Sequence, residues 1–166
     1  DDIASMTHLR DWLEAHLPAA DEAALVHGDY RLGNIMFAPD QRRILAVLDW
    51  ELSTIGHPLT DVALFCLFYD LPAGMPHFDG LQGLDLAALG IPSVEDVLTE
   101  YCRCTARRSL DHWPFHLGLA FFRLAAICQG IYDRGRRGNA ADPHAARFAA
   151  IARQLADIGW QRVQRM

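Results

Sequence analysis

Two acidic residues and one amide lie close together in the first third of the chain. Asp29 follows the apolar run Ala24–Val26, Asn34 comes five residues later, and Asp49 follows the apolar run 44–48. Carboxylate and amide oxygens are the ligands that Mg²⁺ prefers, and a carboxylate can also take a proton from a hydroxyl. Phosphoryl transfer from ATP needs such a set, in which one carboxylate orients the acceptor hydroxyl and the other two groups hold the metal. The three residues are therefore candidates for phosphoryl-transfer chemistry.

The apolar pattern around these residues predicts a small amount of β-structure. Ala24–Val26 predicts a strand that leads into the segment of Asp29. The runs Ile35–Phe37 and 44–48 are separated by turn-forming residues at 39–42, which predicts a β-hairpin. The candidate residues thus cluster around the hairpin, and loops held by a rigid scaffold are where chemistry is commonly found.

Helical periodicity accounts for most of the rest, so the expected fold class is mainly α with a short β-hairpin (α+β). Ser93 with Asp96 three residues later resembles a capping box, and Asp142 followed by Pro143 is typical of a helix start. A glycine- and proline-rich loop is expected at 71–91, and everything else after the hairpin is expected to be helical. The predicted helices lie at 7–18, 59–71, 93–105, 115–132 and 142–159.

The segment 27–34 carries the most specific motif. His27, Gly28 and Asp29, followed by Asn34, resemble the H-G-D-x-x-x-x-N catalytic loop of the aminoglycoside phosphotransferase and choline kinase family. Protein kinases have H-R-D-x-x-x-x-N with the same spacing. The resemblance implies that this chain is the C-terminal lobe of a protein-kinase-like fold and that Asp29 is the catalytic base. His27 is expected to orient the loop by hydrogen bonding rather than to transfer a proton.

A second match follows the hairpin. Asp49 stands where this family has the metal-binding aspartate of its D-F-G-like element, which is written D-W-E here. The resemblance implies that Asn34 and Asp49 hold Mg²⁺ on the phosphates of ATP. Trp50 is expected to be a packing residue, whereas Glu51 is either a second metal contact or a solvated charge.

A third match lies at 56–63, which is similar to the G-x-P-x-x-D-x-A segment of the family. It implies that Asp61 is a buried acceptor that braces the backbone of the catalytic loop. The D-W-E-L-S-T sequence from Asp49, and Gln129-Gly130 with Arg134, are most similar to the subgroup found fused to or encoded near acyl-CoA dehydrogenases. The resemblance covers nearly the whole chain and is strongest over 26–71.

Each of these polar residues also has a structural explanation when it is taken alone. Asp29 could form a turn, Asn34 could form an Asx turn, and Asp49 could cap the end of a strand. The catalytic explanation is favoured because the matches occur together and in order at four linked places, including Asp61.

Two arginine-containing segments have more than one interpretation. Arg31 lies where protein kinases carry a lysine that touches the transferred phosphate. It is either a partner of the γ-phosphate or a surface arginine paired with Glu51 or Asp61.

The segment 133–138, which contains Arg134, could bind an anionic tail such as a CoA phosphate. A solvated helix end, where cations and glycine are common, is the favoured interpretation of that segment.

The part of a kinase that grips the nucleotide is not recognisable in this sequence. No G-x-G-x-x-G element occurs, and all fifteen basic residues are arginine, so neither a strand lysine nor a Walker-type lysine exists. We expect one domain at 1–166, with the catalytic loop and metal site at 26–63 and a helical subdomain at 64–166. The N-terminal lobe is expected in sequence outside this chain, and the chain alone is expected to bind Mg·ATP poorly and to be inactive.

Composition restricts the partners. A net charge of −6 argues against nucleic-acid binding, which needs a basic face. The longest apolar runs, such as 62–69, are too short to cross a membrane. The start of the sequence is acidic and amphipathic, so it is not expected to be a signal peptide. The cysteines form no C-x-x-C pair and are expected to be reduced core thiols of a cytoplasmic protein. They are Cys66, Cys102, Cys104 and Cys128.

The predicted function is ATP-dependent phosphorylation of a small-molecule hydroxyl. The subgroup resemblance favours a hydroxyacyl-CoA or hydroxy acid, and the apolar, glycine-rich segment 71–89 suits an acyl chain. An aminoglycoside or choline kinase is the alternative, which an acid-rich acceptor site would favour. A pseudokinase-like binding or regulatory module is a third hypothesis, and the intact set Asp29, Asn34 and Asp49 argues against it.

Overall fold

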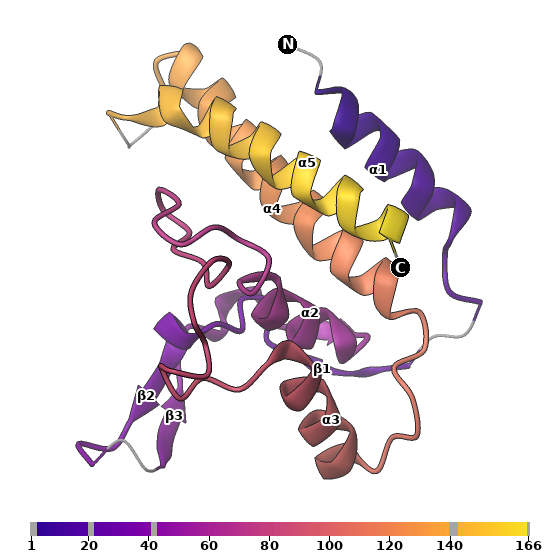
Figure 1. Cartoon of the computed structure of the whole chain (residues 1–166). Coiled ribbons are helices and arrows are strands. Elements are labelled where there is room, and N and C mark those ends of the chain that lie inside the picture. The colour runs from indigo at the N-terminus through magenta and orange to yellow at the C-terminus, as the bar shows by residue number, and fades with distance from the viewer. Residues whose placement is uncertain (1–2, 20–21, 41–42, 140–142, 166) are drawn as a thin grey trace.

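Two long antiparallel helices, α4 and α5, form one side of the molecule in the computed structural model, which describes residues 3–19, 22–40, 43–139 and 143–165 (Figure 1). Helix α4 spans Trp113–Arg136 and α5 spans Phe148–Arg165, with a short 3₁₀ turn at Ala145–Arg147 before α5. Helix α1, Ala4–Ala15, packs beside both of them. These three helices form a layer that supports the part of the chain where the candidate residues lie.

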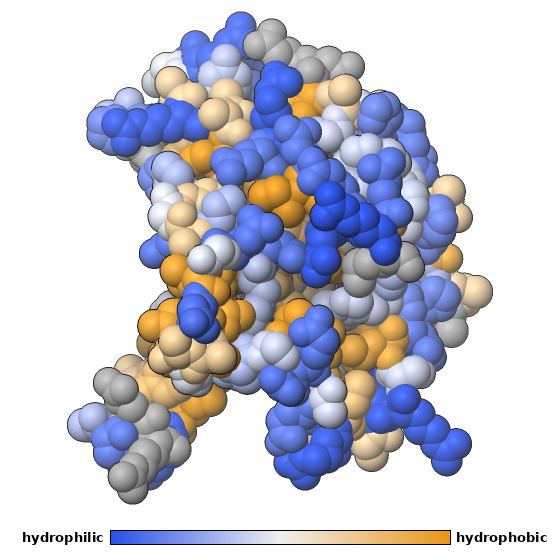
Figure 2. Space-filling model, viewed as in Figure 1, coloured by the Kyte–Doolittle hydropathy of each residue, from blue (hydrophilic) through white to orange (hydrophobic). Residues whose placement is uncertain are grey.

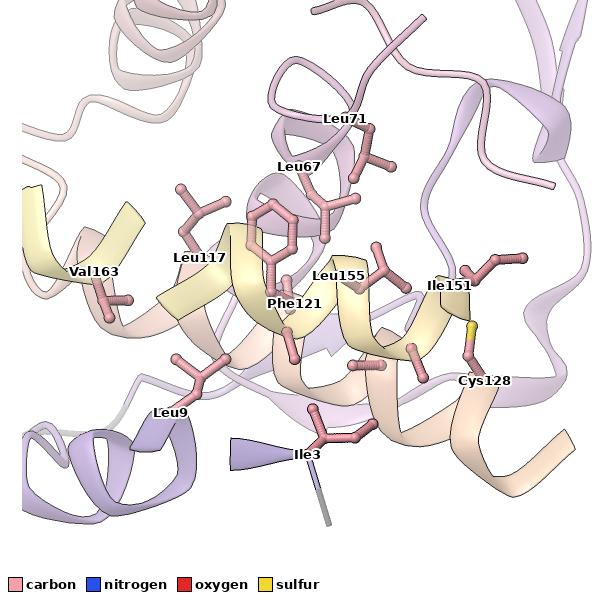
Figure 3. Packing of buried hydrophobic residues seen from close by; sticks show 14 of the residues in the cluster. Ile3, Leu9, Leu67, Leu71, Leu117, Phe121, Cys128, Ile151, Leu155 and Val163 are labelled. Carbon is pink, nitrogen blue, oxygen red and sulfur yellow. The ribbon is translucent and has the colours of Figure 1, made fainter. Parts of the chain in front are cut away.

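The core lies where this layer meets helix α2, Leu59–Leu67. Leu9, Leu67, Phe121 and Leu155 come from four different helices and are fully buried (Figure 3). Burying such a side chain stabilises a fold by about 1.5–3 kcal/mol, so this cluster fixes the position of α2 on the layer. Gly159 permits the close approach of α5 and α4, since a Cβ there would lie 2.5 Å from the Cβ of Phe121.

The strands lie on the other side of α2, and in the described part of the chain they form two separate two-stranded antiparallel sheets. Strand β1, Ala24–Val26, pairs with β4, Thr54–Gly56. Strands β2, Ile35–Phe37, and β3, Ile44–Val47, form the hairpin, in which Ile35 faces Val47. The candidate residues lie between the two sheets.

Several elements match the prediction from sequence. The strand β1 and the hairpin are confirmed. Helix α3, Val94–Thr105, begins with the expected capping box, in which Ser93 Oγ accepts from the Asp96 N–H and the Asp96 carboxylate accepts from the Ser93 N–H. The fold is therefore mainly α with a short hairpin, as expected.

The prediction missed strand β4, because everything after the hairpin was expected to be helical. Strand β4 has three residues, and its pairing with β1 joins segments about thirty residues apart, such as Leu25 with Ile55. A three-residue segment carries little periodicity, so the sequence around it does not reveal a partner so far away.

Helix boundaries also differ from the prediction. Helix α1 begins three residues before Thr7 because Ile3, which is buried in the core, sets its start without a side-chain cap. Helix α2 ends at Leu67 rather than at 71, and α4 is longer than predicted at both ends. Helix α5 continues past Gly159, which is a packing glycine and not a helix end. The predicted cap at Asp142 lies outside the described residues.

Helix α4 corrects the expectation that every apolar segment is too short to cross a membrane. Its length and composition would suffice, although the sequence prediction gave it fewer residues. It contacts α1, α2 and α5, and its residues Phe121, Ala125 and Cys128 are fully buried in the core. We therefore interpret α4 as the central core helix.

The expectation of four core thiols is correct for two of them. Cys66 and Cys128 are buried, and burial raises the pKa of Cys66 to about 12 and that of Cys128 to about 11, so both are held as neutral thiols. Cys102 is half-buried. Cys104 is exposed, because it lies on the outer side of α3, where its Sγ donates to Glu100.

Candidate active site

Asp61 holds the backbone of the loop that contains the candidate base. Its Oδ2 accepts from the His27 N–H at 2.7 Å and its Oδ1 accepts from the Gly28 N–H at 2.9 Å. Asp61 lies in the first turn of α2, where the partial positive charge of the helix end favours a carboxylate. These are the contacts expected of a bracing residue, although Asp61 is half-buried rather than buried.

The His27 ring is fully engaged with the backbone. Its Nε2 lies 2.8 Å from the Leu48 carbonyl oxygen, and the Asp29 N–H donates to its Nδ1 at 3.2 Å. A carbonyl only accepts, so Nε2 must carry the proton and Nδ1 must be the acceptor, which is the neutral ring. His27 is only 2% exposed, and the Trp50 ring lies 4.7 Å from its centroid. This geometry favours the orienting role for His27 over proton transfer.

Gly28 is required at its position for two reasons. Its φ is +83°, in the left-handed region that favours glycine. A Cβ there would also lie 2.5 Å from the Leu52 carbonyl oxygen. The glycine of the H-G-D motif therefore lets the catalytic loop pass close to the segment that follows Asp49.

Asn34 is locked onto Asp29. Its Nδ2 donates to the Asp29 carbonyl oxygen at 2.8 Å and to the Asp29 Oδ2 at 2.9 Å, which fixes the plane of the amide. Asn34 is 6% exposed. The Asx-turn explanation would have the side-chain oxygen accept from a nearby backbone N–H, whereas the contacts seen are made by the nitrogen. This orientation leaves Oδ1 as the atom of Asn34 with which a cation could be held.

Arg31 contacts the candidate base directly. Its Nε donates to the Asp29 Oδ2 at 3.1 Å, and the two side chains are 47% and 30% exposed. The predicted surface pairing with Glu51 or Asp61 is wrong, because Arg31 points back along its own loop toward Asp29. The Asp29 carboxylate is thereby held by two donors, one from each side of Gly33 in the sequence.

Asp49 has a conformation that is unusual for a residue with a side chain. It is left-handed, with φ 67° and ψ 53°, at the start of the 3₁₀ turn Trp50–Leu52. Its side chain makes no capping hydrogen bond, so the explanation of Asp49 as a cap is wrong. Such backbone conformations are costly and are enriched at functional sites.

The hairpin places Asn34 beside Leu48, the residue that precedes Asp49. The Leu48 N–H donates to the Asn34 carbonyl oxygen at 2.8 Å, immediately beyond the pairing of Ile35 with Val47. Among the described residues no group of three or more His, Cys, Asp and Glu is placed to hold a metal. One carboxylate and one amide oxygen nevertheless suit Mg²⁺, which takes its remaining ligands from water and phosphate.

A groove of about 770 Å³ opens beside the candidate base, between the catalytic loop, α2 and α4. Asp29 lies on one wall, and Arg123 and Arg134 lie on the wall formed by α4. Apart from Thr60, the other lining residues are apolar or glycine. Arg123 was not among the predicted site residues, although an arginine in the middle of an apolar helix could have indicated it. Arg134 is exposed in the last turn of α4, as expected of a solvated helix end, and it also lines the groove.

A smaller cavity of about 390 Å³ lies beside residues 31–33 of the same loop. It is lined by Arg31 and Gly33, and by the aromatic residues Phe65, Phe68 and Tyr69. Asp29 does not line it, so a hydroxyl that must reach the base fits the larger groove better.

A buried histidine lies under the start of α2. His116 is 3% exposed, its ring stacks on His57 at 4.3 Å, and neither ring nitrogen has a hydrogen-bond partner. Burial, together with the smaller effect of the nearby His57, His112 and Arg107, lowers the pKa of His116 to about 4. His116 is therefore neutral in the folded protein under conditions where an unfolded chain would protonate it.

We expect acid to destabilise the chain through His116. The unfolded state takes up a proton near pH 6.5 and the folded state only near pH 4, so stability is full above pH 6.5 and is lost as the pH falls toward 4. Each unit of difference between the folded and unfolded pKa corresponds to about 1.4 kcal/mol, so the free energy of unfolding should fall by up to about 3 kcal/mol. Urea unfolding at several pH values measures this decrease in the free energy of unfolding. In His116→Phe the decrease should be smaller by the contribution of His116. An equal loss in wild type and His116→Phe, with exposed His8→Gln as the control, would contradict this account.

Comparison with known proteins supports the architecture and the motifs. Residues 1–98, more than half of the chain, match the model of the phosphotransferase enzyme family. A crystal structure from Ralstonia eutropha, provisionally described as an aminoglycoside phosphotransferase, superposes with a TM-score of 0.92 at 42% identity. The match covers 99% of this chain and 50% of that one. The predicted kinase-like C-terminal lobe is therefore confirmed as the fold.

The curated relatives carry another description. Human acyl-CoA dehydrogenase family member 11 is 46% identical over 99% of this chain, and mouse acyl-CoA dehydrogenase family member 10 is 42% identical over 95%. The chain spans only 21% and 15% of the lengths of these relatives. The matched family model and the close structural relative agree with the motif at Asp29 and Asn34 and with the contacts made by Asp61. The chain belongs to the phosphotransferase enzyme family.

Proposed function

We propose that the full-length protein transfers the γ-phosphoryl group of ATP to a hydroxyl of an anionic small molecule, such as a hydroxyacyl-CoA or a hydroxy acid. The observation that supports this most directly is the groove whose lining combines Asp29, Arg123 and Arg134 with mostly apolar residues. A hydroxyl at Asp29, an acyl chain along the walls and an anionic group at the arginines would fill it.

In this proposal Asp29 takes the proton of the acceptor hydroxyl while the hydroxyl oxygen forms a bond to the γ-phosphorus. The bond between that phosphorus and the bridging oxygen breaks, and ADP leaves with the electron pair. Asn34 and Asp49 would hold Mg²⁺, which when bound neutralises charge on the phosphates. Arg31 keeps the Asp29 carboxylate turned toward the acceptor, through the contact at 3.1 Å.

The charges of the groove distinguish the candidate acceptors. Aminoglycosides and choline are cations and would need acidic residues, yet Asp29 is the only acid among the residues that line the groove in the described part of the chain. Arg123 and Arg134 instead favour an anion, because charge-assisted hydrogen bonds to phosphate or carboxylate are strong. The description of the human and mouse relatives as acyl-CoA dehydrogenase family members favours an acyl-CoA.

The nucleotide grip is proposed to come from a further part of the same protein. Large apolar side chains are exposed on both sheets and gather over the hairpin at the lower left of Figure 2. Exposed apolar patches of this kind mark surfaces that another element covers. The structural relative is about twice as long as this chain, which supports a second lobe on this face. These exposed residues are Leu25, Leu32, Met36, Phe37, Ile44, Leu45, Leu48 and Ile55.

The test is an ATP-dependent phosphorylation screen of the full-length protein against hydroxyacyl-CoAs, free hydroxy acids, aminoglycosides and choline. We expect transfer to an anionic acceptor, and Arg123→Gln and Arg134→Gln should each raise its KM by about 10–100-fold, because each removes a charge-assisted contact. Arg153→Gln on the exposed side of α5 is the matched control.

The screen also separates the alternatives. Better transfer to an aminoglycoside or choline would show that the acceptor class is wrong while the chemistry is right. Binding of an acyl-CoA without transfer to any acceptor would instead favour a pseudokinase-like binding module.

A further inference from the structure

Gly33 lies between the two residues that hold the Asp29 carboxylate. It occupies the middle of the 3₁₀ turn Leu32–Asn34, directly before Asn34 and two residues after Arg31. The turn is closed by the Asn34 N–H, which donates to the Arg31 carbonyl oxygen at 2.9 Å. A side chain added at Gly33 would therefore lie close to both residues that donate to Asp29.

The backbone does not explain why this residue is glycine. Unlike Gly28, Gly33 is not among the residues with positive φ, so an alanine could adopt its conformation. Alanine in place of glycine would moreover stabilise the folded turn, because it lowers the conformational entropy of the unfolded chain.

The neighbouring side chain does explain it. A Cβ on Gly33 would lie 2.8 Å from Arg31 Nη1 and 3.6 Å from Arg31 Cζ. Apart from the residues adjacent in sequence and the backbone of its own turn, no other atom of the described chain would come within 4 Å of this Cβ. The Arg31 guanidinium thus lies across the bare Cα of Gly33.

This position is connected to the candidate base through the rigidity of the guanidinium. The guanidinium is planar, so when Nη1 is pushed aside by rotation about the Cδ–Nε bond, the Nε–H turns with it. Nε is the atom that donates to the Asp29 Oδ2 at 3.1 Å. A methyl group on residue 33 would therefore displace the donor that orients the carboxylate, even though it touches neither Asp29 nor Asn34.

We propose that Gly33 is a positioning residue, whose missing side chain lets Arg31 lie flat beside Asp29 and aim its Oδ2. This inference rests on the proposed function for its effect on phosphoryl transfer, but not for its effect on Arg31. The ion pair is half exposed and contributes little to stability. The role of Gly33 is therefore in the orientation of the base and not in the folding of the loop.

The experiment compares Gly33→Ala in two backgrounds of the full-length protein. In the wild-type background we expect kcat for the acceptor found in the screen to fall about tenfold, because small displacements of a reacting group are costly. KM for the acceptor should be nearly unchanged, and the Tm should be unchanged or slightly higher. In the Arg31→Lys background no guanidinium lies over residue 33, so Gly33→Ala should change kcat by less than about twofold.

A second measurement reports on Arg31 without any turnover. In protein labelled with ¹⁵N-arginine, the Nε–H signal of Arg31, assigned by its loss in Arg31→Lys, should be protected from exchange in wild type and not in Gly33→Ala. An equal loss of kcat in both backgrounds, or an unchanged Arg31 signal in Gly33→Ala, would overturn the proposal. If wild type phosphorylated no acceptor, the proposed function would fail, and the Arg31 signal would still decide whether Gly33 positions Arg31.

Discussion

Asp29→Asn in the full-length protein should lower kcat for phosphoryl transfer by about 10²–10⁴-fold, the range that general-base catalysis contributes. Asparagine has nearly the same shape, and its side-chain oxygen can still accept from Asn34 Nδ2 and Arg31 Nε, so the loop should keep its geometry. What is lost is the ability to accept the proton of the acceptor hydroxyl. Initial rates with saturating acceptor measure the effect.

Two further measurements show whether the Asp29→Asn effect is chemical. The Tm and the Kd for Mg·ATP should change little, since the backbone contacts made by Asp61 do not involve the Asp29 side chain. Asp111→Asn, which neutralises an exposed acid hydrogen-bonded to Ser109, is the matched control for charge. Turnover of Asp29→Asn at the wild-type rate would remove Asp29 from its assigned role.

Asp49→Asn should raise the Mg²⁺ concentration needed for half-maximal activity by at least about tenfold, with a loss of kcat/KM of at least about 100-fold. Asparagine tolerates the left-handed conformation seen at φ 67°, so the turn should persist. It supplies a neutral oxygen in place of a carboxylate, which weakens the hold on a divalent cation. Mg²⁺ titration of the initial rate measures both quantities.

Asp49→Gly distinguishes the role of Asp49 in holding Mg²⁺ from the strain of its backbone conformation. Glycine would relieve the left-handed strain, so this variant should unfold at a higher temperature than wild type and still be inactive. A variant that gained stability and kept a normal Mg²⁺ dependence would show that Asp49 does not hold the metal. Glu51→Gln decides the open question at Glu51, because only a second metal contact would shift the Mg²⁺ titration.

The sequence predicted those parts of the site that are formed by contacts between residues close together in the chain. The segment from His27 to Asn34 closes on itself through contacts of two to five residues, as in the bonds of Asn34 to Asp29. The hairpin is likewise local, with a turn marked by its residue types. Such features are visible in a short window of sequence, so the motif and its strands were placed correctly.

The parts that were missed depend on contacts between distant segments. Strand β4 exists because β1 supplies its partner, and Gly159 interrupts no helix because Phe121 packs against it. Arg123 reaches the groove only because the core fixes the rotation of α4 toward Asp29. The partner of Arg31 was wrong for a similar reason, since the choice among three nearby acids depends on how the loop turns and not on spacing.

The two hydrogen bonds from the catalytic loop to Asp61 have a mechanical consequence. They tie Asp29 to the helix that also carries Thr60 and Leu64 of the groove wall. We therefore expect the proposed base and this wall of the proposed acceptor site to move together. If a nucleotide-bearing lobe opens and closes against the hairpin, the distance that changes is the one from phosphate to acceptor, while the acceptor stays aligned on its base. Each closure would then present the phosphate to a hydroxyl that is already in place.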